Sequence, residues 1–371
     1  MSSLQARSLA SHASAPEPSY KKGSAVSISY NDIHGASPEK LSTLFPKLRE
    51  AFGPEPHCLG IVIVKDLPEH FPQMRHRALA YSAILGKQSP DKLSALESAE
   101  SKYLVGWSRG KENFKGKLDQ LKGSFYVNPT HEYTSSSTQP DFPQYETPNL
   151  WPKLDGFQDA ITTLSRFVVS VGGDVAHACD AYAQSALPES AGYKASYLGD
   201  MVTRSRTCKA RLLHYFAISE AHAKELKEDP QPWCGEHLDH GCLTGLTSAM
   251  FIDEATQPAS ATSPDEIQEL SSSPDPEAGL YIRNRAGEVI KVNIPRDALA
   301  FQTGQALELT TNRSLKAVPH FVVGSGVPGI SRQTLAVFMQ PNLEDTLGNR
   351  KLKFSDFARG IVDENYGVQS A

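Results

Sequence analysis

The second half of the chain carries the pattern that most restricts its fold. From Thr207 onward, short runs rich in β-branched and aromatic residues are separated by Gly, Pro and Asn. Short strands at this spacing predict a sandwich or a jelly roll. The predicted strands comprise residues 209–216, a segment within 243–251, a hairpin over 281–289, and residues 318–323 and 334–339.

The first half predicts a mixed α/β region. Residues 26–30 alternate like a half-buried strand, and residues 59–64 form a continuous apolar run that is typical of a strand buried on both faces. Residues 68–85 predict a helix. Ser89 and Pro90 supply an N-cap and a first-turn proline for another short helix.

A long amphipathic helix is predicted from Phe157 to Tyr182. Its apolar residues are spaced by three and four throughout, which places them in one buried stripe. His177 and Cys179 fall on or beside this stripe. We therefore expect them to pack against neighbours and not to bind a metal.

The order of these elements predicts four parts. A Ser/Pro/acid-rich stretch at 253–279 predicts a solvated surface insertion within the core. The first 16 residues are rich in Ser and Ala and weakly resemble a transit peptide, although a disordered tail is the simpler expectation. The parts are a tail (1–24), an N-terminal α/β region (25–200), a core (201–345) and a C-terminal segment (346–371).

Composition excludes several classes of partner. A net charge of −5 gives no support for nucleic-acid binding, and no apolar run approaches the length of a membrane span. The five scattered cysteines favour a reducing compartment, the cytoplasm. We expect a monomer that acts on a small-molecule substrate, with neither nucleic acid nor membrane as a partner.

Three residues predict a metal centre. His237 and Asp239 are two apart, so in an extended segment their side chains leave the same face. His320 follows 81 residues after Asp239, within an apolar strand that can hold it rigidly. Two imidazoles and one carboxylate favour non-haem Fe(II) with open coordination positions.

Two alternatives remain open for these residues. The compact set Cys234, His237, His240 and Cys242 has ligand types that suit Zn²⁺. All four lie within nine residues, however, which disfavours tetrahedral convergence. The second alternative is that none of these residues binds a metal.

Arg332 and Thr334 predict a carboxylate-binding fork. They alternate with their neighbours, so both face one side of a strand, and an apolar run follows them. A guanidinium beside a core requires an anionic partner, because an unpaired buried charge is costly. An organic co-substrate with a carboxylate would meet this need. The alternative is a structural ion pair with Asp or Glu.

Taken together, these motifs resemble the Fe(II)- and 2-oxoglutarate-dependent oxygenases of the isopenicillin N synthase-like superfamily. The N-terminal segments 102–112 and 122–129 resemble a subgroup of these enzymes without an assigned substrate. The sequence departs from the family at Leu213, Phe216 and Gln305, where Asn, Pro and an acid are common. The matching segments are 211–216 (R-L-L-H-Y-P in the family), 237–244 (H-x-D-x-G-x-L-T), 279–283 (G-L-x-V-R), 319–322 (P-H-R-V) and 332–334 (R-x-S/T).

The resemblance implies an α+β fold with a double-stranded β-helix (jelly-roll) core, supported by the N-terminal region and long helices. It implies His237, Asp239 and His320 as iron ligands and catalytic residues. It implies that Arg332 and Thr334 clamp the distal carboxylate of 2-oxoglutarate, with a hydroxyl donor from Tyr215.

The function implied is that of a dioxygenase, an oxidoreductase that uses Fe(II) and O₂. It would couple oxidative decarboxylation of 2-oxoglutarate to hydroxylation or desaturation of a small molecule. Two alternatives share the site: an Fe(II) oxidase of the same fold that uses no 2-oxoglutarate, and a metal-binding relative without turnover.

Overall fold

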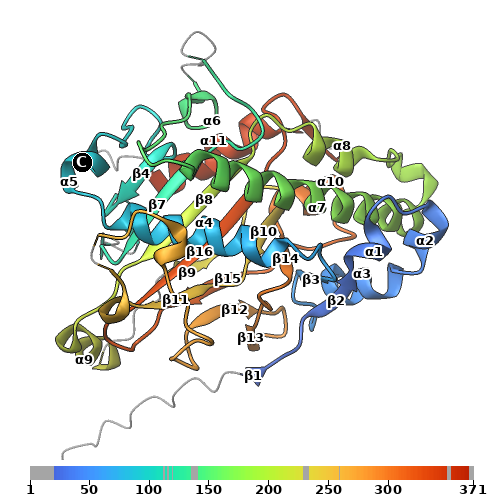
Figure 1. Cartoon of the computed structure of the whole chain (residues 1–371). Coiled ribbons are helices and arrows are strands. Elements are labelled where there is room, and N and C mark those ends of the chain that lie inside the picture. Colours follow the sequence, from blue (N-terminus) through green and yellow to red (C-terminus); the bar gives the residue numbers. More distant parts are fainter. Residues whose placement is uncertain are drawn as a thin grey trace, which may run out of the picture.

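The computed structural model describes residues 21–111, 113–114, 117–118, 120–134, 141–228, 234–258, 260–348 and 352–366. Within these residues the chain has an α+β fold, in which two β-sheets face each other and helices cover the outer face of the larger one (Figure 1). Most of the predicted tail lies outside the described residues. Lys21–Lys22 (β1) pair in parallel with a strand of the smaller sheet, three residues before the predicted start of order.

The larger sheet draws strands from both halves of the chain. Only β2 and β3 pair in parallel in it, and its other neighbours are antiparallel. The predicted N-terminal region therefore supplies strands at both edges of the sheet that contains the predicted core. In order, the strands are β2 (Val26–Ser29), β3 (Ile61–Lys65), β14 (Leu299–Thr303), β10 (Leu243–Thr247), β16 (Ile330–Met339), β8 (Lys209–Tyr215), β7 (Lys122–Val127) and β4 (Gly106–Arg109), with β11 (Met250–Asp253) also beside β16.

The smaller sheet closes the jelly roll. Val322 of this sheet packs on Leu213, Tyr215 and Ala336 of the larger sheet, so apolar side chains fill part of the interior. This arrangement confirms the predicted jelly-roll core. The strands run in the order β1, β13 (Val289–Val292), β12 (Gly279–Arg283), β15 (His320–Val323) and β9 (Cys234–His237), and two further pairs are β5 (Asn113–Phe114) with β6 (Lys117–Leu118) and β17 (Thr346–Leu347) with β18 (Leu352–Lys353).

Two long helices, α4 (Phe71–Gly86) and α7 (Phe157–Ala186), lie over the larger sheet (Figure 1). Among the described residues, none of the helices combines the length and apolar character that a membrane crossing would need. The remaining helices are α1 (Tyr30–Ile33), α2 (Pro38–Ser42), α3 (Phe45–Phe52), α5 (Pro90–Ser94), α6 (Pro143–Glu146), α8 (Tyr197–Thr203), α9 (Glu220–Glu228), α10 (Gln305–Thr310) and α11 (Phe354–Tyr366), with 3₁₀ turns at Glu189–Ala191, Glu254–Thr256 and Pro264–Glu266.

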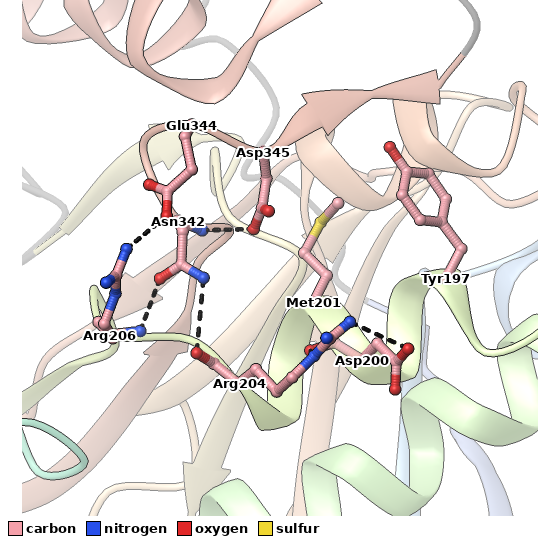
Figure 2. Close-up of a pocket in the computed structure, with 8 residues that line it drawn as sticks. All are labelled: Tyr197, Asp200, Met201, Arg204, Arg206, Asn342, Glu344 and Asp345. Atoms are coloured by element: carbon pink, nitrogen blue, oxygen red, sulfur yellow. Dashed lines mark hydrogen bonds and ion pairs between the residues drawn. The ribbon is translucent and has the colours of Figure 1, made fainter.

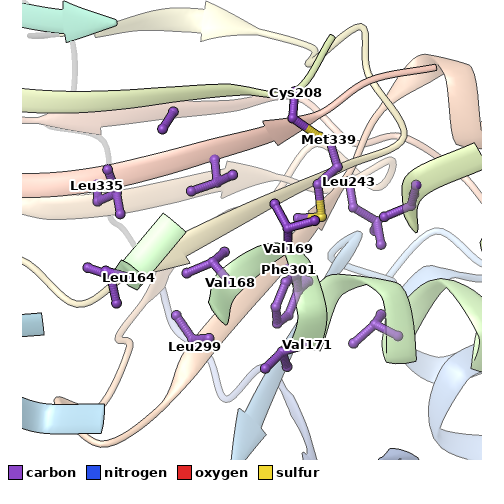
Figure 3. Close-up of a cluster of buried hydrophobic side chains, with 14 of the residues drawn as sticks. Leu164, Val168, Val169, Val171, Cys208, Leu243, Leu299, Phe301, Leu335 and Met339 are labelled. Atoms are coloured by element: carbon purple, nitrogen blue, oxygen red, sulfur yellow. The ribbon is translucent and has the colours of Figure 1, made fainter. Parts of the chain in front are cut away.

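The predicted apolar stripe of α7 packs directly on the larger sheet (Figure 3). Two glycines allow the close approach. A Cβ at Gly245 would lie 2.2 Å from Val168 Cγ1, and one at Gly172 would lie 2.3 Å from Met339 Sδ. Both contacts are too short for any larger side chain, so the helix and the sheet meet at these glycines.

Several predicted boundaries differ from those observed. Tyr30 begins α1 instead of ending a strand, and α4 begins at Phe71, three residues after the predicted start. The segment 243–251 contains two strands, β10 and the start of β11, which are separated at residues 248–249. The break has a physical reason, because the backbone carbonyls at these two positions accept hydrogen bonds from Arg75 of α4.

The stretch 253–279 is docked more firmly than its composition indicates. Ala261 and Ile267 are buried in the main core. Glu269 accepts bonds of 3.0 and 2.9 Å from Arg75, and Arg296 lies 3.3 Å from the same carboxylate. The expectation of a solvated surface insertion is therefore wrong for the part that holds Ala261, Ile267 and Glu269, because a few buried side chains outweigh the polar average.

Candidate active site

The three predicted metal ligands meet at one end of the smaller sheet. His237 ends β9 and pairs with His320, the first residue of β15. Asp239 follows two residues after His237, and its carboxylate oxygens lie 3.6 Å from His237 Nε2 and 3.7 Å from His320 Nε2. The candidate donor atoms of all three residues lie within 4.8 Å of one another.

Backbone carbonyls orient both imidazoles. His237 Nδ1 lies 2.7 Å from the Gly235 oxygen, and His320 Nδ1 lies 3.4 Å from the Val318 oxygen. An N–H donated from Nδ1 leaves Nε2 as the free lone pair, and in both residues Nε2 faces Asp239. Cys234 Sγ lies 3.9 Å from His237 Nδ1, on the opposite side of the ring from Nε2.

Thr244 orients the carboxylate of Asp239. Its hydroxyl donates a 2.5 Å hydrogen bond to Asp239 Oδ2 from β10 in the larger sheet, and so links the two sheets at the site. Thr244 lies within the 237–244 motif, for which only the His and Asp had a predicted role. Its position five residues after the aspartate was the available signal.

The charges and pKa shifts of the three candidate ligands favour a site for a metal cation. Burial alone would raise the pKa of Asp239, but His320, His237 and the Thr244 hydroxyl outweigh burial and lower it. Burial lowers the pKa of His320, which favours the neutral ring. Burial lowers the pKa of His237, but Cys234 and Asp239 outweigh burial and raise it, so a metal ion that binds Nε2 would displace a proton from this ring.

The geometry fits a divalent metal ion. Neighbouring ligands of an octahedral ion, each about 2.1 Å from it, lie about 3 Å apart. The observed separations of 3.6 and 3.7 Å exceed this by less than 1 Å. Two imidazole nitrogens and one carboxylate, with no further His, Cys, Asp or Glu of the described residues in the cluster, match the facial arrangement that favours Fe(II).

The zinc alternative is excluded because its four residues do not converge. Cys242 is buried in the main core, with its Sγ 3.6 Å from Met201 Sδ. His240 stacks on Phe354, with the ring centroids 6.3 Å apart. These two side chains therefore serve packing.

The predicted fork lies on the inner face of the larger sheet. Arg332 pairs with Tyr215 across β16 and β8, and Thr334 pairs with Leu213, so these residues share one face. The Arg332 guanidinium lies over the Tyr215 ring, 4.9 Å from its centroid. Thr334 Oγ1 makes only a long contact of 3.5 Å, with the Thr247 oxygen.

Arg332 is buried without a carboxylate. Its side chain is 6% exposed, and its Nε and Nη1 atoms have no hydrogen-bond partner. Within the described part of the chain, no Asp or Glu lies within ion-pair distance of it. Burial lowers the pKa of Arg332 while the Tyr215 hydroxyl opposes this effect. The alternative of a structural ion pair is therefore not observed among these residues.

The space between the sheets is reached by solvent. Leu246 and Phe338 of the larger sheet and Val322 of the smaller sheet are partly exposed. Leu246 and Phe338 lie on the face opposite the one that α7 covers, because their strand neighbours face the helix. Their exposed surface therefore faces the interior.

A separate cavity of about 400 Å³ lies near α8. Both arginines of its lining are paired, because Arg204 binds Asp200 at 3.0 Å and Arg206 binds Glu344 (Figure 2). No cation in this lining is left for a ligand, so we assign the cavity no role.

Comparison with known proteins gives structural matches only. The sequence matches no known protein family and no curated protein. The fold is similar to that of a full-length Neurospora crassa protein in complex with α-ketoglutarate and thymine, at 19% identity and a TM-score of 0.59, with 86% of each chain covered.

Two further structures agree. A Caulobacter crescentus protein described as a 2OG-Fe(II) oxygenase is 18% identical, with a TM-score of 0.63, over 92% of this chain and 99% of that one. The rice dioxygenase for auxin oxidation is 16% identical, with a TM-score of 0.55, over 92% and 97%. The chain therefore has the fold of the 2-oxoglutarate/Fe(II) oxygenases.

Proposed function

We propose that this chain is an Fe(II)- and 2-oxoglutarate-dependent dioxygenase that hydroxylates or desaturates a small molecule. The observation that carries the proposal is a His-Asp-His triad at the end of the smaller sheet together with a buried arginine on the larger sheet that has unpaired N–H groups. The order of the sequence motifs supports placing it in the isopenicillin N synthase-like superfamily.

His237, Asp239 and His320 would hold the metal. Fe(II), when bound there, supplies oxygen activation and the oxidative decarboxylation of 2-oxoglutarate. The protein fixes the geometry in advance, because Gly235 and Val318 orient the imidazoles. Ordered donors do not have to be reorganised when the ion enters.

Arg332 would bind the distal carboxylate of 2-oxoglutarate. The two free N–H groups match a carboxylate, and an anion would compensate the buried charge. Thr334 and Tyr215 would add hydroxyl donors from the same face. The α-ketoglutarate bound to the Neurospora crassa protein supports this choice of co-substrate.

We further propose a monomer in a reducing compartment, the cytoplasm. All five cysteines are free, and four of them are buried. Size-exclusion chromatography with light scattering tests the monomer. Thiol labelling before and after lysis under alkylating conditions tests the compartment.

The test of the function uses the full chain purified without oxygen and loaded with Fe(II). We expect O₂ uptake and succinate release with 2-oxoglutarate and none without it. Asp239→Ala should lose both iron binding and succinate release, whereas Asp265→Ala, an exposed acid remote in sequence, should keep both. A wild-type protein that binds Fe(II) and consumes O₂ without forming succinate would show an oxidase that uses no 2-oxoglutarate.

A further inference from the structure

A buried lysine lies on the inner face of the larger sheet. Lys209 begins β8, is 5% exposed and pairs with Phe338 of β16. Phe338 pairs in turn with Thr244, the residue that donates to Asp239. Neighbouring strands are about 4.8 Å apart, so the backbones of Lys209 and Thr244 are about 10 Å apart in one cross-strand row.

The Lys209 ammonium has no partner. Its Nζ makes no hydrogen bond, and within the described residues no acid lies within ion-pair distance. Burial lowers the pKa of Lys209 to about 7. An apolar residue here would avoid the cost of burying an amine, so the fold itself gains nothing from this lysine.

The cross-strand row that runs from Lys209 to Gln302, about 14 Å over three strand spacings, combines polar and apolar groups. Gln302 belongs to the same row on β14, is fully buried, and leaves its Oε1 without a partner. Arg211, two residues along β8, faces the same side, and Ser124 accepts hydrogen bonds of 3.0 and 2.8 Å from its guanidinium. Phe338, between these polar groups, is partly exposed.

Lys209 is remote from the fork. Arg332 and Phe338 are six residues apart on β16, which is about 20 Å along the strand. The fork and the row of Lys209 therefore lie toward opposite ends of β16, and the two cations are not parts of one carboxylate clamp. The unpaired ammonium is therefore available to a ligand other than the one that Arg332 binds.

We propose that Lys209 binds the carboxylate of the primary substrate, which is then a small monocarboxylic acid with an apolar body. The proposal rests on the proposed function, because it names the substrate class of the same site. Of the two cations on this face of β8, Arg211 already donates to Ser124, whereas the Lys209 ammonium makes no hydrogen bond, and one such ammonium matches a monoanion. The partly exposed Phe338 and Leu246 would contact the apolar body.

The test compares small carboxylic acids with their uncharged primary amides, phenylacetate, cinnamate and octanoate among them. The full chain is held under argon with Fe(II) and 2-oxoglutarate, and its melting temperature is titrated with each probe. The variants are Lys209→Met, Lys209→Gln and Lys209→Arg. Lys65→Met, an exposed lysine at the end of β3, is the matched control.

We expect acids to stabilise the wild type and Lys65→Met more than the amides do. Lys209→Met and Lys209→Gln should weaken acid binding about 10- to 100-fold, the range for a lost charged hydrogen bond, while Lys209→Arg keeps the preference. Equal binding of acids by wild type and Lys209→Gln would overturn the proposal, as would a wild type that prefers no acid over its amide. Succinate release by the wild type is measured separately, so a failure of the proposed function is distinguished from a failure at Lys209.

Discussion

Two buried arginines of this protein differ in how completely the fold pairs them. Arg75 of α4 is 1% exposed, and it donates to the Ser248 and Ala249 carbonyls and to both oxygens of Glu269. Arg332 of β16 is 6% exposed, and its Nε and Nη1 have no acceptor among the residues that the structure describes. The guanidinium of Arg75 therefore has its hydrogen-bond acceptors within the folded protein, whereas that of Arg332 lacks some of them.

The difference separates a structural role from a binding role. Burying a guanidinium costs several kcal/mol in either place. At Arg75 folding itself supplies the compensating partners, which tie α4 to the 253–279 segment. At Arg332 folding leaves the compensation incomplete, so a ligand has to supply it. Lys209 resembles Arg332, because folding leaves its buried charge without a partner among the described residues.

The largest effect on stability is expected from removing Arg75, the fully paired arginine. Arg75→Ala leaves the Glu269 carboxylate buried with less compensation, and should lower the free energy of unfolding by about 3–5 kcal/mol in urea denaturation. Arg77→Ala on the same helix is the control. Arg77 is half-exposed, 3.6 Å from Asp159, and its loss should change stability by less than about 0.5 kcal/mol. Similar losses for both variants would contradict the comparison.

Arg332, the incompletely paired arginine, should show the reverse: its loss should weaken ligand binding and not stability. Arg332→Ala should weaken 2-oxoglutarate binding about 100-fold, because the co-substrate loses its buried cation, and leave the free energy of unfolding unchanged or higher. Isothermal titration under argon measures the affinity, and urea denaturation measures the stability. Arg283→Ala, on the exposed side of β12 beside Glu236, should keep wild-type affinity. An Arg332→Ala protein as unstable as Arg75→Ala would show that the two arginines have the same role.

The residues found from the sequence are those that local spacing places together. His237 and Asp239 are two apart in an extended segment, and Arg332 and Thr334 are two apart on one strand, so period-two geometry alone put each pair on one side. The jelly roll was also predictable, because its short strands are bounded by turn residues.

The residues that were missed depend on pairing between distant strands. Lys209 faces the interior because β8 pairs with β16, more than 100 residues later in the chain. The link from Arg75 to Glu269 joins two segments 194 residues apart. Nothing local distinguishes either side chain from a surface charge, so the three-dimensional pairing had to be known first.

A smaller effect is expected at the hydrogen bond that orients Asp239. Thr244→Val keeps the shape of the side chain and removes the donor, so Fe(II) affinity should fall about 10- to 100-fold. Thr310→Val is the control, because the Thr310 hydroxyl is buried and already has no partner. Fe(II) titration of the apoprotein under argon measures both. Equal affinities in the two variants would remove Thr244 from the site.

The smallest effect concerns the outer face of the same sheet, where His214 lies behind the fork. Burial lowers its pKa to about 4, with Lys87 and Arg109 adding to this effect and Glu254 opposing it. Between pH 6.5 and 4 the unfolded chain therefore binds a proton that the folded chain does not, so stability falls as the pH falls. From pH 7 to 5.5 the loss should be about 1 kcal/mol, measured by urea denaturation. His214→Gln should remove this part of the slope, whereas the same substitution at the exposed His70 should keep it. A slope that is the same in both variants would assign the acid sensitivity to other groups.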